Sequence, residues 1–255
     1  MLTAYLTATR SLLQLPGINS TSLYSDADLT RFINTARGQV AGEGECIRVH
    51  GTATTVVGQD GPYPFSAINI GTPATTGIQG VINIQSMHVV IGNGQLFMAP
   101  RPWPWFSLYN RNSATPQQAT PTEWAQYGQG AAPSGVANTT INGGTFYVSP
   151  QPDDTYTLNC NTTCYPQALA LDTDVEALPI FWTDAVPFFA AYFALMSAQT
   201  NARMADAAQM YKGHYEEFMD RARKQSNPSV NRWLYQQAGD PAQGPKMGVK
   251  AGAQG

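Results

Sequence analysis

Acid–base and nucleophilic catalysis depend most often on histidine, and this chain of 255 residues has only three: His50, His88 and His214. His50 and His88 fall among apolar residues in strand-like stretches, and His214 lies beside Tyr215 in a helical pattern. No Gly-x-Ser-x-Gly motif is present, and no serine or cysteine is spaced to pair with a histidine. We therefore expect structural histidines, no catalytic residues and no enzymatic activity.

The three cysteines, Cys46, Cys160 and Cys164, are the next candidates for chemistry. A structural zinc site needs four ligands, and no second Cys or His pair accompanies Cys160 and Cys164. An odd number of cysteines in a long chain also argues against a disulfide framework. We predict free thiols, with no metal and no other cofactor.

Two acidic segments offer paired carboxylates, one at Asp153 and Asp154 and one at Asp172, Asp174 and Glu176. Such pairs can hydrolyse glycosides, so a hydrolase remains an alternative function. The second segment also resembles the start of a calcium loop, but the obligatory glycine and the closing glutamate are absent. A capped or solvated connector is the interpretation that we prefer.

An aromatic stretch with two prolines runs through Trp103, Trp105, Phe106 and Tyr109. These rings could stack on sugars or bases, but aromatic clusters more often cover the open end of a small sheet or anchor a protein interface. The prolines exclude a central strand. The alternative is a binding module that recognises a carbohydrate or a host receptor.

Helical patterns near the two ends of the chain must position these segments. The longest runs from Asp184 to Gln225, with Pro187 in its first turn, where a missing N–H costs nothing. Residues 188–196 are apolar around the whole helix, so protein must surround them. One apolar stripe follows, made of Met204, Ala208, Tyr211, Tyr215, Phe218 and Ala222. A continuous helix would measure about 60 Å, unless Gly213 or Thr200-Asn201 divides it.

Two shorter helices are predicted in the N-terminal part. Residues 1–14 form the first, which ends before Pro16-Gly17. Ser25 is a natural N-cap for the second, and Gly42 and Gly44 are expected to end it. Both are amphipathic and too short to be stable alone, so they should pack against the long C-terminal helix.

From Cys46 the apolar period becomes that of β-strands. Strands are predicted at residues 47–49, 55–57, 65–70, 81–84, 87–91, 95–98, 145–148 and 156–160. A turn at Gly51 or at residues 58–61 would pair the first two strands, and Gly92-Asn93-Gly94 would form a hairpin. A second hairpin is predicted around residues 150–154.

Helices at both ends and strands between them predict an α+β fold. A helical bundle formed by the N- and C-terminal helices would carry an inserted antiparallel β domain, sandwich- or barrel-like, and an extended C-terminal tail. We place the discontinuous bundle at residues 1–45 and 172–238, and the β domain at 46–171. Residues 239–255 form a flexible tail, because their Gly-, Ala-, Gln- and Pro-rich composition provides no core.

Charge and hydropathy exclude two kinds of partner. Charged residues make up 12% of the chain, the net charge is −3 and the first lysine is Lys212, so nucleic-acid affinity is not expected. The longest apolar run, residues 185–198, is too short to span a bilayer, and the N-terminus lacks a signal-peptide pattern. An intracellular product without a membrane partner is expected.

Four patterns cover nearly the full length of the chain. They are Tyr5-Leu6-x-x-Thr9-Arg10 with residues 25–37, then Arg101-Pro102-Trp103-Pro104-Trp105-Phe106, then Tyr147-Val148-x-Pro150-x-Pro152, and last Val186-Pro187-Phe188-Phe189-Ala190-Ala191-Tyr192 with Tyr215-x-x-Phe218-Met219. Together they resemble the head-to-tail adaptor (connector, or head-completion) proteins of short-tailed bacteriophages. They are structural patterns and include no active-site motif.

The resemblance implies a homo-oligomeric ring, commonly a dodecamer, that binds beneath the portal protein of the capsid. The ring would extend the DNA channel and provide a platform for the tail nozzle or tube, and packaged DNA would pass without sequence-specific binding. The protein would be made in the cytoplasm of the bacterial host and reside in the virion, at the neck between capsid and tail. A tail-tip, tail-tube or minor capsid role is the alternative within the structural class.

We assign three sets of contact residues on this basis. Subunit packing is assigned to Phe188, Phe189, Tyr192, Phe193, Met204, Tyr211, Tyr215 and Phe218. Portal contact is assigned to Leu2, Tyr5, Leu6, Trp233, Tyr235, Lys246 and Lys250. Contact on the tail side is assigned to Trp103, Trp105, Phe106 and Tyr109.

Overall fold

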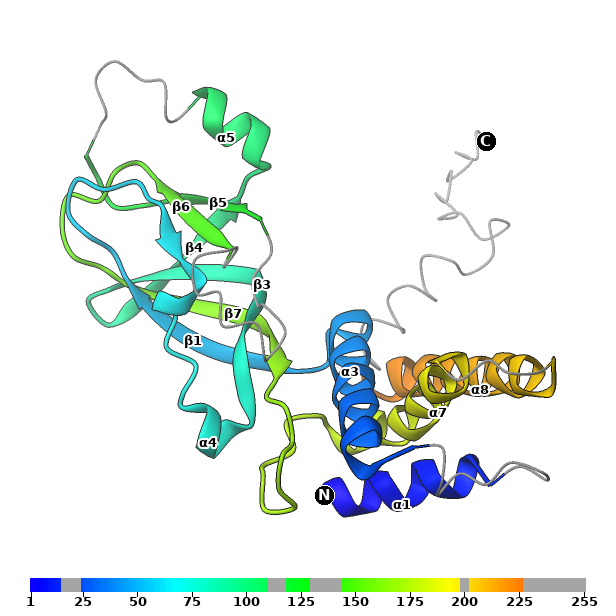
Figure 1. The fold of residues 1–255 in the computed structure, drawn as a ribbon. Helices are drawn as coiled ribbons and strands as arrows, with labels where there is room; N and C mark the ends of the chain where they lie inside the picture. The colour runs from blue at the N-terminus through cyan, green and yellow to red at the C-terminus, as the bar shows by residue number, and fades with distance from the viewer. Residues whose placement is uncertain (15–23, 110–117, 129–143, 198–201, 227–255) are drawn as a thin grey trace, which may run out of the picture.

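The computed structural model describes residues 1–14, 24–109, 118–128, 144–197 and 202–226. Helices from the two ends of the chain lie together, and strands from its middle form a curled sheet beside them (Figure 1). The α+β fold predicted from the sequence is therefore confirmed.

The helical part consists of α1 (Leu2–Leu12), α3 (Asp26–Gly44), α6 (Ile180–Thr183), α7 (Ala185–Ser197) and α8 (Ala202–Ser226). α7 is central, because it packs against α1, α3 and α8. Val186, Ala190 and Leu195 of α7 are fully buried, so neighbouring helices meet its apolar surface on several sides. The terminal helices thus pack on each other, as expected.

The long C-terminal pattern forms two helices instead of a continuous one. α7 and α8 lie side by side and run in opposite directions (Figure 1). The division falls at residues 198–201, which include the predicted break at Thr200-Asn201 and lie outside the described residues. Gly213 lies within α8 and does not divide it.

Ser25 caps α3 as predicted, since its Oγ accepts a hydrogen bond from the backbone N–H of Asp28 at 3.1 Å. The helix ends at Gly44, as predicted, but Gly42 lies inside it, and the left-handed conformation at the C-cap is taken by Glu45, with a φ of 44°, instead of a glycine. Gly44 is needed for packing: a Cβ at this position would lie 2.4 Å from the ring of Trp182.

In the part of the chain that the structure describes, the sheet has seven strands in the order β1-β7-β3-β4-β5-β6-β2. Their bounds are β1 (Arg48–Thr54), β2 (Tyr63–Pro64), β3 (Ile78–Ile91), β4 (Gly94–Pro100), β5 (Glu123–Tyr127), β6 (Thr145–Ser149) and β7 (Thr157–Pro166). Three short helices, η1 (Phe65–Ala67), α4 (Pro73–Thr76) and α5 (Trp103–Tyr109), lie between strands. Neighbouring strands are antiparallel except β4 and β5, which pair in parallel at Ala99 and Pro100.

One of the two predicted hairpins is confirmed. β3 and β4 pair antiparallel up to Ile91 and Gly94, and Gly92 in the turn has a φ of 56°, which favours glycine. The two strands predicted at 81–91 form the single strand β3, which contains three register shifts. The second hairpin is wrong, because β6 pairs with β2 and β5 whereas β7 lies between β1 and β3.

The predicted pairing of residues 47–49 with 55–57 is also wrong. β1 pairs with β7 instead, and Val56 and Val57 lie beyond its end, each about half exposed. Residues 65–70 contain η1 and one isolated bridge, from Asn69 to Thr52, in place of a strand. Both errors arise because the partners in this sheet are distant in sequence.

The sheet curls until its two ends approach each other. Thr52 in the edge strand β1 exchanges two backbone hydrogen bonds with Asn69, at 3.1 and 2.8 Å. Asn69 follows soon after β2, the strand at the other edge. This closure agrees with the expected barrel-like arrangement.

A single hydrophobic cluster extends from the bundle into the sheet, and includes Ile33 of α3, Ala190 of α7 and Ile84 of β3. The boundaries at residues 45 and 172 remain a prediction, and the tail 239–255 lies outside the described residues. The segment Ile180–Ser197 is long and apolar enough to cross a membrane by composition alone. Half of it is buried inside the protein, and core helices meet the same criterion.

Candidate interaction surfaces

The histidines lie on three separate elements. His50 on β1 and His214 on α8 are exposed, while His88 on β3 is half-buried with its ring edge-on to Phe97, at a centroid distance of 5.5 Å. His214 lies 4.0 Å from Glu217, one turn along the same helix. The three side chains therefore do not form a common site, and their structural role remains a prediction.

All three cysteines are free thiols, as predicted. Burial raises the pKa of Cys46 and of Cys160 to about 12, so both remain protonated at neutral pH. Burial also raises the pKa of Cys164, whose Sγ lies 3.4 Å from the hydroxyl of Thr162. Within the described residues, no three His, Cys, Asp or Glu side chains gather as metal ligands would.

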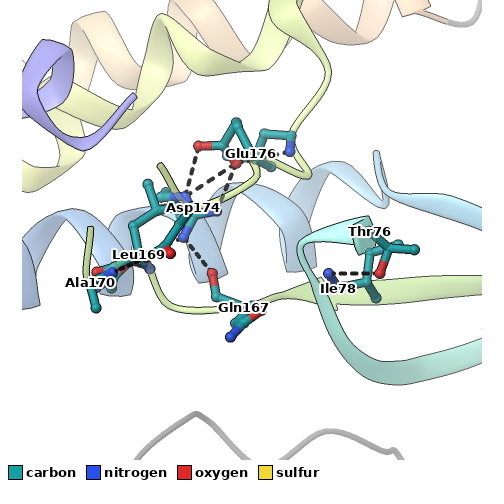
Figure 2. A network of polar contacts seen from close by, with 10 residues as sticks. Thr76, Ile78, Gln167, Leu169, Ala170, Asp174 and Glu176 are labelled. Atoms are coloured by element: carbon teal, nitrogen blue, oxygen red, sulfur yellow. Dashed lines mark hydrogen bonds and ion pairs between the residues drawn. The ribbon is translucent and has the colours of Figure 1, made fainter. Parts of the chain in front are cut away.

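The acidic connector is held by hydrogen bonds within the protein (Figure 2). The carboxylate of Asp174 accepts the backbone N–H groups of Ala170 and Leu171, which lower its pKa. Asp172 accepts from the α-ammonium group of Met1 at 2.6 Å, and this contact lowers its pKa. The segment is therefore a capped connector, which is the interpretation preferred above.

The ion pair between Glu176 and Arg37 was not predicted from the sequence. Arg37 lies on the buried face of α3, and its guanidinium donates to Glu176 Oε1 at 2.7 Å and to Oε2 at 3.0 Å. It also donates to the carbonyl of Gln167 at 2.7 Å and to Asn34 Oδ1 at 3.1 Å. The available signal was an arginine within the apolar stripe of a helix, a position that requires a partner when buried.

The aromatic stretch, for which a central strand was excluded, forms the helix α5, packed on the sheet. Trp103 lies 4.6 Å from Tyr147 and 4.8 Å from Tyr127 between ring centroids, and Phe106 is fully buried beneath it. Tyr109 is the last residue of the helix. The rings of Trp103 and Phe106 cover one end of the sheet, as one of the two interpretations expected.

The outer side of α5 is exposed. Trp105 is 37% exposed, and the guanidinium of Arg101 lies 4.7 Å from its ring centroid. Arg101 is in turn held by Glu123 of β5 at 2.5 Å. Leu108, three residues after Trp105 on α5, is exposed, and so is Tyr127 of β5, whose ring contacts Trp103 of α5. Exposed apolar side chains gathered in this way are typical of a contact surface.

The eight residues assigned to subunit packing divide into two groups. Phe189, Met204, Tyr211 and Tyr215 are buried within the bundle, whereas Phe188, Tyr192, Phe193 and Phe218 are half-buried. Many of the rings contact one another, and the closest pair is Phe189 with Tyr215 at 4.3 Å. Only the half-buried group has surface left for another chain.

The residues assigned to portal contact divide in the same way. Leu2 and Tyr5 of α1 are buried, and Leu6 is half-buried. Burial, together with the nearby charge of Glu176, raises the pKa of Tyr5. Trp233, Tyr235, Lys246 and Lys250 lie outside the described residues.

A second exposed apolar surface was missed, at the β3–β4 hairpin. Ile91, Leu96 and Phe97 are each 44 to 56% exposed, and no charged residue lies between Ile78 and Pro100. β4 pairs with β5 only at Ala99 and Pro100, so within the described residues the rest of β4 has an open edge on that side. Charged side chains normally protect such an edge, and their absence here indicates a surface suited to another protein. Periodicity could have revealed it, because apolar residues fall on both faces of β4.

A helical bundle and a curled sheet, each with exposed aromatic or aliphatic side chains, are typical of a protein that contacts other proteins. Residues 3–234 match the family described as SU10 adaptor protein. Because this match spans nearly the whole chain, the protein belongs to that family of bacteriophage head-to-tail adaptors and is a structural component of the virion. No curated protein matches the sequence.

Proposed function

We propose that the protein forms a ring, of twelve copies, that docks beneath the portal protein and extends the DNA channel toward the tail. The ring provides the platform to which the tail nozzle or tube attaches, at the neck of the virion. Membership of the adaptor family over residues 3–234 carries this proposal. The protein acts without enzymatic activity, and is made in the cytoplasm of the bacterial host.

Side-by-side association is supported by the half-buried rings of α7. Tyr192 and Phe193 lie next to each other, with ring centroids 5.7 Å apart, and both keep exposed surface. A neighbouring subunit would remove this apolar surface from water, which stabilises an interface by roughly 25 cal/mol per Å² before the costs of association are counted. Phe189, Met204, Tyr211 and Tyr215 contribute by holding the two helices together.

Two different ends of the subunit are suited to two partners. The exposed face of α5 lies on the side of the sheet away from the helices (Figure 1), and we assign it to the tail nozzle or tube protein. The portal contact is assigned to α1, with Leu6 at the surface and Leu2 and Tyr5 holding the helix in place. Trp233, Tyr235, Lys246 and Lys250 complete this contact.

The charge of the chain suits a channel through which DNA slides. Binding of DNA strengthens with each phosphate that a cation neutralises, and the net charge here is −3 with 14 Lys and Arg residues in total. DNA therefore passes the ring without sequence-specific binding.

The proposal is tested by mixing the subunit with the purified portal ring and measuring mass by light scattering. We expect a complex with as many adaptor copies as portal subunits. With a Tyr192→Ser/Phe193→Ser variant, fewer adaptor copies should bind to each portal ring. Met210→Ser is the matched control, because Met210 is an exposed apolar residue on the other helix, α8. A subunit that stays strictly monomeric beside the portal would overturn the proposal.

A further inference from the structure

An open groove lies between α1, α7 and α8, with a volume of about 470 Å³. One wall is formed by the short side chains of Ala4 and Ala8, which leave space beside the helix. The opposite side is formed by Phe188 and Phe218, whose rings stack at 5.1 Å with an interplanar angle of 21°. Pockets of this size and character bind aromatic and aliphatic groups.

We infer that residues 230–235 of the same chain occupy this groove in the free subunit, with the side chains of Trp233 and Leu234 against the rings of Phe188 and Phe218. The inference concerns the subunit before assembly, and it does not depend on the proposed docking to a portal. Binding to a partner would then have to release this segment.

The position of the groove on α8 supports this occupant. Phe218 lies eight residues before Ser226, the last residue of the helix, so about 12 Å of helix separates the groove from the start of the C-terminal segment. Six residues, 227–232, precede Trp233, and an extended chain of six residues spans about 20 Å. Pro228 prevents the helix from continuing through Asn227, so the chain can turn back.

Charge and composition support the same occupant. The groove is mostly apolar, and Asp184 contributes a carboxylate at its edge. Residues 230–235 read Val-Asn-Arg-Trp-Leu-Tyr, which places one cation, Arg232, immediately before three large apolar side chains. Aromatic residues beside an arginine are the residues most enriched at the centres of tight contacts. Elsewhere beyond Ser226, the chain has no second group of aromatic residues.

Cysteine cross-linking of the full chain tests this inference. The pair Ala8→Cys/Leu234→Cys should form an intramolecular disulfide at least tenfold faster than the control pair Glu216→Cys/Leu234→Cys. Glu216 is exposed on α8 and closer in sequence to Leu234 than Ala8 is, but it does not line the groove. Native Cys46 and Cys160 interfere little at pH 8, because burial keeps their thiols protonated.

Gel mobility under non-reducing conditions distinguishes the outcomes. A faster monomer band in the Ala8 pair alone supports the inference. Equal rates of disulfide formation for both pairs would overturn the inference. A disulfide found only between two copies would also overturn it, because the groove would then hold residues 230–235 of a neighbouring copy. As a second measurement, Asp184→Arg in the Ala8 pair should slow disulfide formation severalfold, and adding Arg232→Glu should restore the original rate. If neither change alters the rate of disulfide formation, the proposed contact between Asp184 and Arg232 is wrong.

Discussion

The guanidinium of Arg37 donates to both carboxylate oxygens of Glu176, although 139 residues separate them in sequence. Arg37 lies on α3 and Glu176 lies on the connector between β7 and α6, so this pair attaches the return of the chain to the N-terminal helix. The two side chains are 1% and 11% exposed. Each is therefore the main counter-charge of the other in a site with little water.

Removal of this arginine should destabilise the protein strongly. Arg37→Met leaves the Glu176 carboxylate buried without its partner, and breaking a buried pair in this way costs about 3–5 kcal/mol. Urea unfolding at pH 7 measures the loss. Arg221→Met, which breaks the exposed pair with Glu217, is the control and should cost at most about 1 kcal/mol. Equal losses in the two variants would show that the buried pair has no special role.

Two glycines near the end of α3 should respond oppositely to alanine. Gly42→Ala should stabilise by about 0.5–1 kcal/mol, because no atom lies within 4 Å of the new Cβ and alanine favours the helix. Gly44→Ala should destabilise by about 1–3 kcal/mol, because its Cβ would meet the ring of Trp182 at 2.4 Å. Thermal unfolding of both variants measures these two changes in stability. A stabilising Gly44→Ala would mean that Trp182 moves freely.

The stability of the connector should depend on acid pH through Asp174. Backbone N–H groups of Leu171 and Ala170 lower the pKa of this carboxyl in the folded state, so its stabilising effect is complete above the unfolded value of about 3.9. The effect is lost as the pH falls through the lower folded pKa. Unfolding free energies of the wild type and Asp174→Asn, measured from pH 7 to pH 2, should therefore converge at low pH. A difference that widens in acid would contradict this sign.

Neighbouring residues of α5 should separate stability from binding. Phe106 is fully buried, so Phe106→Ala should cost about 3–5 kcal/mol of stability. Trp105→Ala should cost much less, because Trp105 keeps much of its surface in water, and should instead weaken attachment of the tail protein. Denaturant unfolding and pull-down of the tail protein by assembled rings measure the two effects. Full attachment by a stable Trp105→Ala variant would exclude Trp105 from the tail contact.

Short-range features of this fold could be predicted because neighbouring residues cause them. The Ser25 cap depends on one hydroxyl and the N–H of Asp28, and the turn at Gly92 depends on a glycine that accepts positive φ. The burial of α7 follows from a run of apolar residues with no polar face. The aromatic contacts of Trp103 could be foreseen only as the preferred of two possibilities, since an aromatic ring can pack on a sheet end or stack on a ligand.

The sequence alone determined where the longer helices α1, α3, α7 and α8 lie, which of their faces are apolar, and that the chain has the patterns of an adaptor protein. Tertiary structure alone decided that β7 inserts between β1 and β3, that Arg37 finds Glu176, and that Ala4 and Ala8 leave a groove beside Phe188. The physical reason is the range of the interactions. Caps and turns form between residues a few positions apart, whereas strand order and buried charge pairs depend on which distant surfaces exclude water together.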